Sequence, residues 1–300
     1  MKTLQIMKRS RMWVSISVAI ILIGAVFYFI HGGFNLGIDF AGGTQIYAKI
    51  GRDFDVNEVR GMLNDEGINA TVMRAGDAKQ DALIRLKDNP DIKTQQDTVI
   101  ELLADKYDLN IQTEFSSEFV GSTIGKELYG KAVLSLAIAS VLMLLYIWIR
   151  FELMSGVAAV LALIHDVLIM TAAVLIFQVP INSPFIAALL TIIGYSINDT
   201  IVVFDRVREN RKRFSRSLSR NEVVDKSISE TIVRSMNTSL TTLFAVAALY
   251  IIGVESIKEF TFPILIGIIS GTYSSIFIAS PIWSWMGDAR DRRKQAKLAK

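Results

Sequence analysis

The stretch IIGYSINDTIVVFDR, residues 192–206, decides the fold because it places an acid inside an apolar segment. Asp199 lies six residues before Asp205 and Arg206, where the apolar run ends. A charge in a bilayer core costs roughly 2.5–3.5 kcal/mol on insertion scales, so it normally faces a protein interior and serves a function there. The stretch predicts a membrane span with Asp199 as its functional centre. A carboxylate that is merely satisfied by neighbouring hydroxyls is the structural alternative.

Composition supports a membrane protein. Hydrophobic residues make up 51% of the chain and charged residues 20%, and the mean hydropathy is +0.40. The charges gather in blocks between long apolar runs, which is typical of a polytopic α-helical membrane protein. The chain has no cysteine and only two histidines, which argues against disulfides and against thiolate or His-rich metal sites. We expect no cofactor, no metal and no nucleic-acid partner.

Six stretches approach or exceed the roughly 20 apolar residues that a helix needs to cross the hydrocarbon core. They are residues 12–30, 131–149, 154–177, 185–204, 235–252 and 260–286. The first follows basic residues and could be a signal peptide. However, it is long for one, and Gly32-Gly33 is a poor cleavage site. We therefore interpret it as an uncleaved anchor.

Basic residues are concentrated in three segments outside these spans: the N-terminus, the loop at about 205–234 and the tail at 287–300. The loop at 178–184 carries no charge. Short cytoplasmic loops are enriched in Lys and Arg, and an even number of spans separates the three segments. This pattern predicts that residues 1–30 form a cytoplasmic N-terminus and the first span, and that both termini are cytoplasmic. Residues 131–286 would then hold the other five spans.

The segment 31–130 lies between the first two spans and is long enough for one extracytoplasmic domain. Alternating apolar residues predict a strand or strand pair over 34–50, and Asp55 can cap a helix closed by Gly67. The expected elements that follow are strands at 70–74 and 82–86, a helix at 92–106 and a last strand at 110–115. The order βαββαβ is that of a ferredoxin-like α+β fold, which by itself says little about function.

The motif GIDFAGGT, residues 37–44, stands where this domain leaves the membrane. Asp39, Gly42 and Gly43 are candidates for a functional joint between domain and membrane. A strand start with glycine-enabled turns is an equally good interpretation.

Two polar stripes are predicted on neighbouring spans. In the fourth span Thr191, Tyr195, Asn198 and Asp199 fall at helical spacing, and in the fifth Arg234 is followed by threonines at similar spacing. Matching stripes indicate that Arg234 reaches Asp199, with Asn198 beside them. The alternative for Arg234 is an anchor that extends to the membrane interface.

Further polar or small residues lie in the other spans. His165 and Asp166 are near the middle of the third span, where they could extend a proton path or form a structural polar cluster. Gly267, Gly271 and Ser275 form a small-residue ridge on the sixth span, which predicts close packing within the bundle or with another subunit. Before the fifth span, Ser219 and Glu222 form a capping box for a helix expected along the membrane surface.

Five motifs together resemble the SecF subunits of the bacterial SecD/SecF family, which is related to the resistance-nodulation-division exporters. They are GIDFAGGT, VGSTIGKEL, ALIHDV, GYSINDTIVVFDRVREN and RSMNTSLTT, in this order along nearly the whole chain. The resemblance implies six spans and one outer domain in the cytoplasmic membrane. It also implies that the chain works with SecD and the SecYEG translocon in the lipid bilayer, on a translocating preprotein. Late steps of export would use the proton-motive force, with no enzymatic activity.

The same resemblance assigns roles to single positions. Asp199 matches the carboxylate that the family needs for proton passage, and Arg234 matches the arginine that opens the fifth-span motif. Asp39, His165 and Asp166 match signature positions of less certain role. The chain has only the SecF half, so a separate SecD is expected.

Three other classes of protein remain as alternatives. A resistance-nodulation-division exporter of small molecules or lipids would need a larger outer domain than about 100 residues. A passive scaffold would tolerate loss of Asp199. A membrane hydrolase would need a nucleophile beside His165, where the sequence offers only Asp166.

Overall fold

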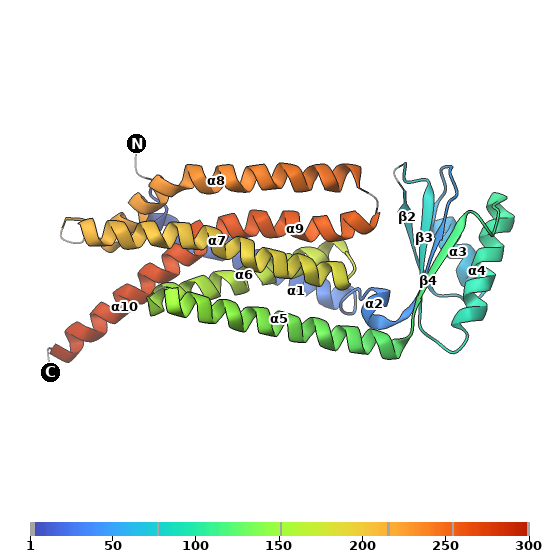
Figure 1. Ribbon diagram of the computed structural model, residues 1–300, viewed down its shortest axis with the longest axis horizontal. Coiled ribbons are helices and arrows are strands. Elements are labelled where there is room, and N and C mark those ends of the chain that lie inside the picture. Colours follow the sequence, from blue (N-terminus) through green and yellow to red (C-terminus); the bar gives the residue numbers. More distant parts are fainter. Residues whose placement is uncertain (1–3, 77, 151, 215–216, 254, 299–300) are drawn as a thin grey trace.

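The protein is an elongated helical bundle that carries a small α/β domain at one end (Figure 1). The computed structural model describes all residues except 1–3, 77, 151, 215–216, 254 and 299–300. Lys2, Arg216 and Lys300, which belong to the basic segments above, lie outside the described residues. Both chain ends lie at the end of the bundle opposite the domain (Figure 1), as an even number of spans requires.

Within the described part of the chain, six segments are long and apolar enough to cross a membrane, which confirms the prediction of a six-span protein. They are α1 (Ser10–Ile30), α5 (Ser122–Arg150), α6 (Leu153–Phe177), α7 (Ser183–Phe214), α8 (Arg220–Ile252) and a final run. That run consists of α9 (Glu255–Ser274), a π-helical segment (Ser275–Ala279) and α10 (Ser280–Leu298). A short 3₁₀ turn, Met7–Arg9, precedes α1.

Three of the spans form the centre of the bundle. About half or more of the most apolar window is buried in α6 and α7 (50% each) and in the sixth span (67%), against 6–11% in α1, α5 and α8. The outer helices therefore expose apolar surface, as a lipid environment allows. Many of the buried polar side chains therefore lie between α6, α7 and the sixth span, and others lie on the inward faces of α1 and α8.

The predicted basic loop at about 205–234 is mostly helical. α7 continues to Phe214, and α8 begins at Arg220 and runs without a break through the fifth span. The predicted capping box is confirmed, because Ser219 and Glu222 exchange hydrogen bonds at the start of α8. No Gly or Pro interrupts residues 220–252, so nothing separates the expected surface helix from the span. Its apolar residues Val224 and Ile228 pack in the bundle core instead.

The outer domain has the predicted βαββαβ order. Its elements are β1 (Gly43–Ala48), α3 (Val56–Asp65), β2 (Ala70–Ala75), β3 (Asp81–Lys87), α4 (Ile92–Tyr107) and β4 (Phe115–Val120). The strands are antiparallel in the order β2-β3-β1-β4. Asp55 caps α3 by accepting from the Asn57 N–H. Helices α3 and α4 cover the face of the sheet that points away from the bundle (Figure 1).

Two strand predictions in this domain are wrong. The alternating residues 34–40 form no regular strand: Leu36 makes one isolated bridge to Ile181, and Ile38–Ala41 is the single-turn helix α2. The last strand begins at Phe115, because residues 110–114 form a turn in which the Glu114 N–H donates to the Asn110 carbonyl. Contact with the distant loop before α7 fixes residues 35–37, and sequence periodicity carries no sign of that contact.

The glycine pair joins the bundle to the sheet. Gly42 has φ 76° and ψ 160°, a region that essentially only glycine occupies. A Cβ there would lie 2.8 Å from the Ser122 Cα at the start of α5. Gly43 has φ 137°, and a Cβ there would overlap the Leu86 carbonyl oxygen of β3. Both positions need glycine for its conformation and for the close approach of other backbone.

We predict that Gly42→Ala lowers the free energy of unfolding by about 3 kcal/mol, from backbone strain together with overpacking. Gly51→Ala is the matched control, because Gly51 also has positive φ (67°) but no atom within 4 Å of its Cβ position. It should cost only about 1–2 kcal/mol. Thermal unfolding of the purified protein in detergent measures both, and equal losses would contradict the packing argument.

Candidate functional site

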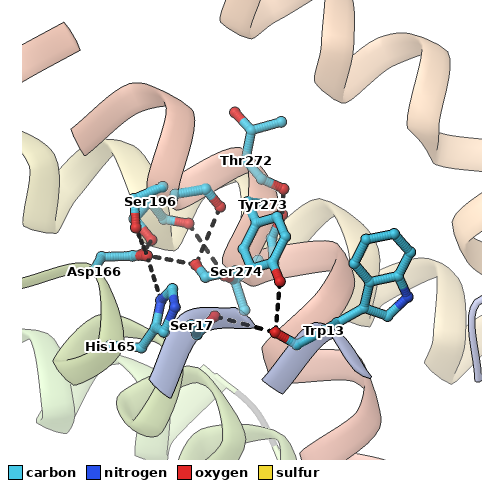
Figure 2. A network of polar contacts seen from close by, with 12 residues as sticks. Trp13, Ser17, His165, Asp166, Ser196, Thr272, Tyr273 and Ser274 are labelled. Carbon is cyan, nitrogen blue, oxygen red and sulfur yellow. Dashed lines mark hydrogen bonds and ion pairs between the residues drawn. The ribbon is translucent and has the colours of Figure 1, made fainter. Parts of the chain in front are cut away.

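Asp166 lies at the centre of a buried polar cluster between α6, α7 and α9 (Figure 2). Its carboxylate is fully buried and accepts hydrogen bonds from three serine hydroxyls. The donors are Ser196 on α7 at 2.5 Å, Ser270 on α9 at 2.6 Å and Ser274 on α9 at 2.7 Å. The Nδ1 atom of His165 lies 3.0 Å from Asp166 Oδ1. One carboxylate therefore connects the three central spans.

This arrangement allows the carboxyl group to exist with or without a proton. A buried carboxylate is stable only when hydrogen bonds replace its lost water, and charge-assisted bonds from hydroxyls are strong. A serine hydroxyl can donate or accept. The cluster can therefore keep its hydrogen bonds when Asp166 gains a proton, which a cluster of fixed N–H donors could not do.

Asp199, the residue singled out from the sequence, forms a second buried carboxylate on α7. Only 6% of Asp199 is exposed, and its Oδ2 accepts from Ser275 Oγ at 3.2 Å. Ser275 directly follows Ser274, so adjacent serines of the sixth span contact the two carboxylates. Ser275 also starts the π-helical segment Ser275–Ala279, a local widening of the helix that is frequent at functional sites.

The two serines each have a second acceptor. Ser274 Oγ also lies 3.2 Å from the Gly271 carbonyl, and Ser275 Oγ lies 3.0 Å from the Thr272 carbonyl. A hydroxyl has one proton to donate, so each serine can turn between a carboxylate and its own helix backbone. A change of charge on either acid would shift that balance.

His165 extends the cluster toward α1. Its ring stacks on Tyr273 with centroids 6.1 Å apart, and the Tyr273 hydroxyl donates to the Trp13 carbonyl at 2.7 Å (Figure 2). The Nε2 atom of His165 is buried and has no hydrogen-bond partner in the described part of the chain. This nitrogen is an open position at which a proton or a water molecule could be held.

The polar stripes predicted on the fourth and fifth spans meet only in part. The Tyr195 hydroxyl donates to the Thr238 carbonyl at 3.2 Å, but the other predicted members do not come together. Asn198 is exposed beside α5, in a shallow groove that also contains Tyr146, whereas Asp199 points inward. Arg234 is exposed, and no ion pair to Asp199 occurs among the residues that the structure describes. The buried face of α8 carries Ser235 and Ser239 instead. One residue along a helix turns the side chain by about 100°, which separates Arg234 from the inward face.

The small-residue ridge packs within the bundle. A Cβ on Gly267 would overlap Ile192 of α7, and a Cβ on Gly271 would lie 3.0 Å from Ser196 Cβ. The absence of side chains here lets α9 approach α7 closely, which brings Ser270, Ser274 and Ser275 within reach of the acids. Ser196, Ser270 and Ser274 were missed from the sequence, and Ser275 was predicted only as a packing residue. The i, i+4 spacing of Ser270 and Ser274 in an apolar span was the available signal.

A second polar arrangement joins the outer domain to the same central helices. Asp39 accepts from the Ser183 N–H at 2.8 Å, so this acid lies at the N-terminus of α7, where the helix dipole favours a negative charge. The Gly37 N–H donates to the Ile181 carbonyl at 2.9 Å. GIDFAGGT thus contacts the end of the helix that carries Asp199.

The sheet itself contacts the start of the sixth span. Arg85 of β3 pairs with Glu259 of α9 at 2.5 Å, with side chains only 12% and 10% exposed. Asn182 Nδ2 donates to the other carboxylate oxygen of Glu259 at 2.6 Å. A buried ion pair therefore connects the open face of the sheet to the helix that carries Ser274 and Ser275.

A bundle of six apolar spans with buried carboxylates, which also contacts a small α/β domain, defines a multi-pass membrane protein. Residues 99–289 match the family model described as protein export membrane protein SecD/SecF, C-terminal, and residues 27–49 match the SecD/SecF GG motif. The chain belongs to the SecD/SecF family, on its SecF side.

Individual relatives agree with this assignment. Protein translocase subunit SecF of Sebaldella termitidis is 36% identical over 99% of this chain and 96% of its own length. SecF of Petrotoga mobilis is 37% identical over 96% of this chain and 97% of its own length. The crystal structure of SecDF from Thermus thermophilus matches with a TM-score of 0.83 at 35% identity, covering 94% of this chain. The chain spans 38% of that SecDF protein.

We predict that the double change Ser196→Ala with Ser274→Ala lowers the free energy of unfolding by about 3–5 kcal/mol. It removes two hydroxyl donors from a buried acid, and hydrogen bonds to charged groups contribute about 1.5–3 kcal/mol each. The control Ser239→Ala removes a buried bond between two neutral hydroxyls, Ser239 and Thr272, and should cost about 1 kcal/mol. Chemical denaturation in detergent micelles measures both. Equal effects would show that Asp166 does not depend on these hydroxyls.

Loss of the Arg85–Glu259 pair should destabilise the joint between domain and bundle. Arg85→Met leaves Glu259 buried without its cation, and breaking such a pair typically costs about 3–5 kcal/mol. Lys131→Met breaks an exposed i, i+4 pair with Glu127 and should cost less than about 1 kcal/mol. Limited proteolysis at the domain boundary and thermal unfolding report the difference. A variant as stable as the control would contradict a structural role for the pair.

Proposed function

We propose that this chain is the SecF half of an export complex that uses the proton-motive force to promote late steps of protein translocation. The SecF names of full-length relatives support the subunit assignment. SecDF, in which this chain spans 38–40% of the length, supports a partnership with SecD. We further propose the SecYEG translocon and the translocating preprotein as partners, in the bacterial cytoplasmic membrane with both termini cytoplasmic.

The observation that carries the proton-driven mechanism is the pair of buried acids contacted by adjacent serines of the sixth span. A proton that enters from outside neutralises Asp199 and weakens the hydrogen bond that Asp199 accepts from the Ser275 hydroxyl. That hydroxyl then turns to the Thr272 carbonyl, and the contact between α7 and α9 loosens. Asp166 and His165 can also take up a proton, because the hydroxyls around Asp166 can reverse their hydrogen bonds. Ser196 passes a proton on without keeping it.

Changes in the helices would reach the outer domain through two contacts. Asp39 holds the N-terminus of α7, and Arg85 holds Glu259 on α9. A shift of α9 against α7 would therefore tilt the sheet relative to the membrane. One charge moving through 100 mV releases about 2.3 kcal/mol, which biases a two-state element without locking it. In this proposal a rotation of α8 would turn the Arg234 cation toward Asp199.

Asp199→Asn tests the proposal, because it keeps the size of the side chain and removes its charge. We expect normal insertion and folding, and loss of the part of export that depends on the ion gradient. Membrane vesicles that contain SecD and the variant would be assayed for export of a model secretory protein, with and without the gradient.

Glu127→Gln is the matched control for this experiment. It makes the same carboxylate-to-amide change at an exposed ion pair with Lys131, so gradient-dependent export should be retained. If Asp199→Asn supports export as well as the parent does, the mechanism is wrong and a passive scaffold becomes the better description.

A further inference from the structure

A small charged cavity of about 120 Å³ lies at the end of the bundle opposite the outer domain. It is enclosed by the start of α6, the end of α7 and α10. Its lining residues are Glu152, Ser155, Phe204, Val207, Arg208, Arg211, Lys212 and Trp283. Phe204 and Val207 form an apolar floor, and the remaining residues supply polar groups around it.

The cavity carries a positive charge that the described residues do not balance. Arg208, Arg211 and Lys212 lie at i, i+3 and i+4 on α7, so they share one face of the helix. Arg211 pairs with Glu152 at 3.1 Å. Arg208 and Lys212 make no ion pair with any residue that the structure describes. Cations near a helix C-terminus are favourable in themselves, so charge alone does not establish a ligand site.

Trp283 lines both this cavity and a larger neighbouring one, and it adds a buried donor beside the cations. Only 2% of this residue is exposed, and its indole N–H is buried with no hydrogen-bond acceptor within the described chain. Buried donors in native proteins nearly always have a partner, and an exception calls for an explanation such as an absent ligand. Tryptophan is also common at membrane interfaces, where its ring is apolar and its N–H finds a polar partner.

The neighbouring cavity, of about 350 Å³, does not have the same character. It is also lined by Trp283 and Arg211, but its further cation Arg220 is neutralised by Asp288 and Asp291. The unbalanced positive charge is therefore confined to the smaller cavity, between Arg208 and Lys212.

An apolar groove begins at the same turn of α6. It has a volume of about 510 Å³ and runs between α5 and α6. All the residues that line it are apolar, and they lie within 141–147 on α5 and 153–161 on α6. Leu153 and Gly156 border the groove, whereas Glu152 and Ser155 border the charged cavity. A positively charged cavity and an apolar groove that meet at one helix turn match a ligand with an anionic head and a hydrocarbon chain.

We propose that this cavity binds the headgroup phosphate of an anionic phospholipid, with one acyl chain of the lipid in the groove between α5 and α6. Arg208 and Lys212 supply the charge, and the Trp283 N–H and Ser155 hydroxyl donate to phosphate oxygens. Basic pockets between spans recognise anionic headgroups by this chemistry. The site is separate from the buried acids and does not depend on the proposed proton path.

Lipid binding to the purified full-length chain in detergent tests the proposal, with phosphatidylglycerol, phosphatidylcholine and inorganic phosphate as probes. Native mass spectrometry counts bound lipid, and the thermal unfolding midpoint reports stabilisation. We expect phosphatidylglycerol to bind and stabilise the parent, and phosphatidylcholine to do neither. Arg208→Gln with Lys212→Gln should weaken phosphatidylglycerol binding roughly thirtyfold.

Trp283→Phe keeps an aromatic side chain and the net charge but removes the ring that carries the N–H, so it should weaken phosphatidylglycerol binding about tenfold. The control Lys8→Gln with Arg9→Gln changes the charge equally at the same end of the bundle and should bind as the parent does. Affinities are compared below each variant's unfolding midpoint, so a less stable variant still gives a result.

Unchanged affinity in both pocket variants would overturn the proposal. An equal loss in the control would also overturn it, because binding would then follow overall charge. Stabilisation by inorganic phosphate equal to that by phosphatidylglycerol would overturn the lipid assignment.

Discussion

The cost of keeping carboxylates inside an apolar bundle governs the rest of this structure. Asp166 has no access to solvent, so its hydrogen bonds must come from other spans. Ser196 and Ser274 supply them, and they reach it only because Gly267 and Gly271 let α9 lie against α7. The hydrogen bonding of the acid therefore depends on close packing of the three central helices, and neither can change without the other.

The same central helices carry the outer domain. α7 begins at the Asp39 carboxylate and α9 holds Glu259 against Arg85, so both helices that contact the acids also contact the domain. The glycine pair removes the side chains that would separate β1 from α5 and β3. A movement of α7 against α9 would therefore also move the outer domain. This gives the coupling in the proposed mechanism a physical route.

The opposite end of the bundle has a different character. Salt bridges of Arg220 and the capping box at Ser219 fix the start of α8, and the end of α7 presents uncompensated cations beside a buried tryptophan. The inner acids and this basic end lie on the same helix, α7. Lipid bound at one end and a proton at the other would both act on the position of α7.

The sequence alone determined the six spans, the βαββαβ order and the burial of Asp199, because hydropathy, capping residues and the cost of a buried charge act locally. It also placed Gly42 and Gly43 at the joint between the outer domain and the helical bundle. Only the tertiary structure decided that Asp166 has the denser hydrogen-bond cluster, and that Asn198 and Arg234 point outward. Rotation of a helix about its axis is set by packing against its neighbours, which one apolar segment does not encode. The backbone near Phe34 depended likewise on contact with the distant loop before α7, whereas a local turn at 110–114 set the start of the last strand.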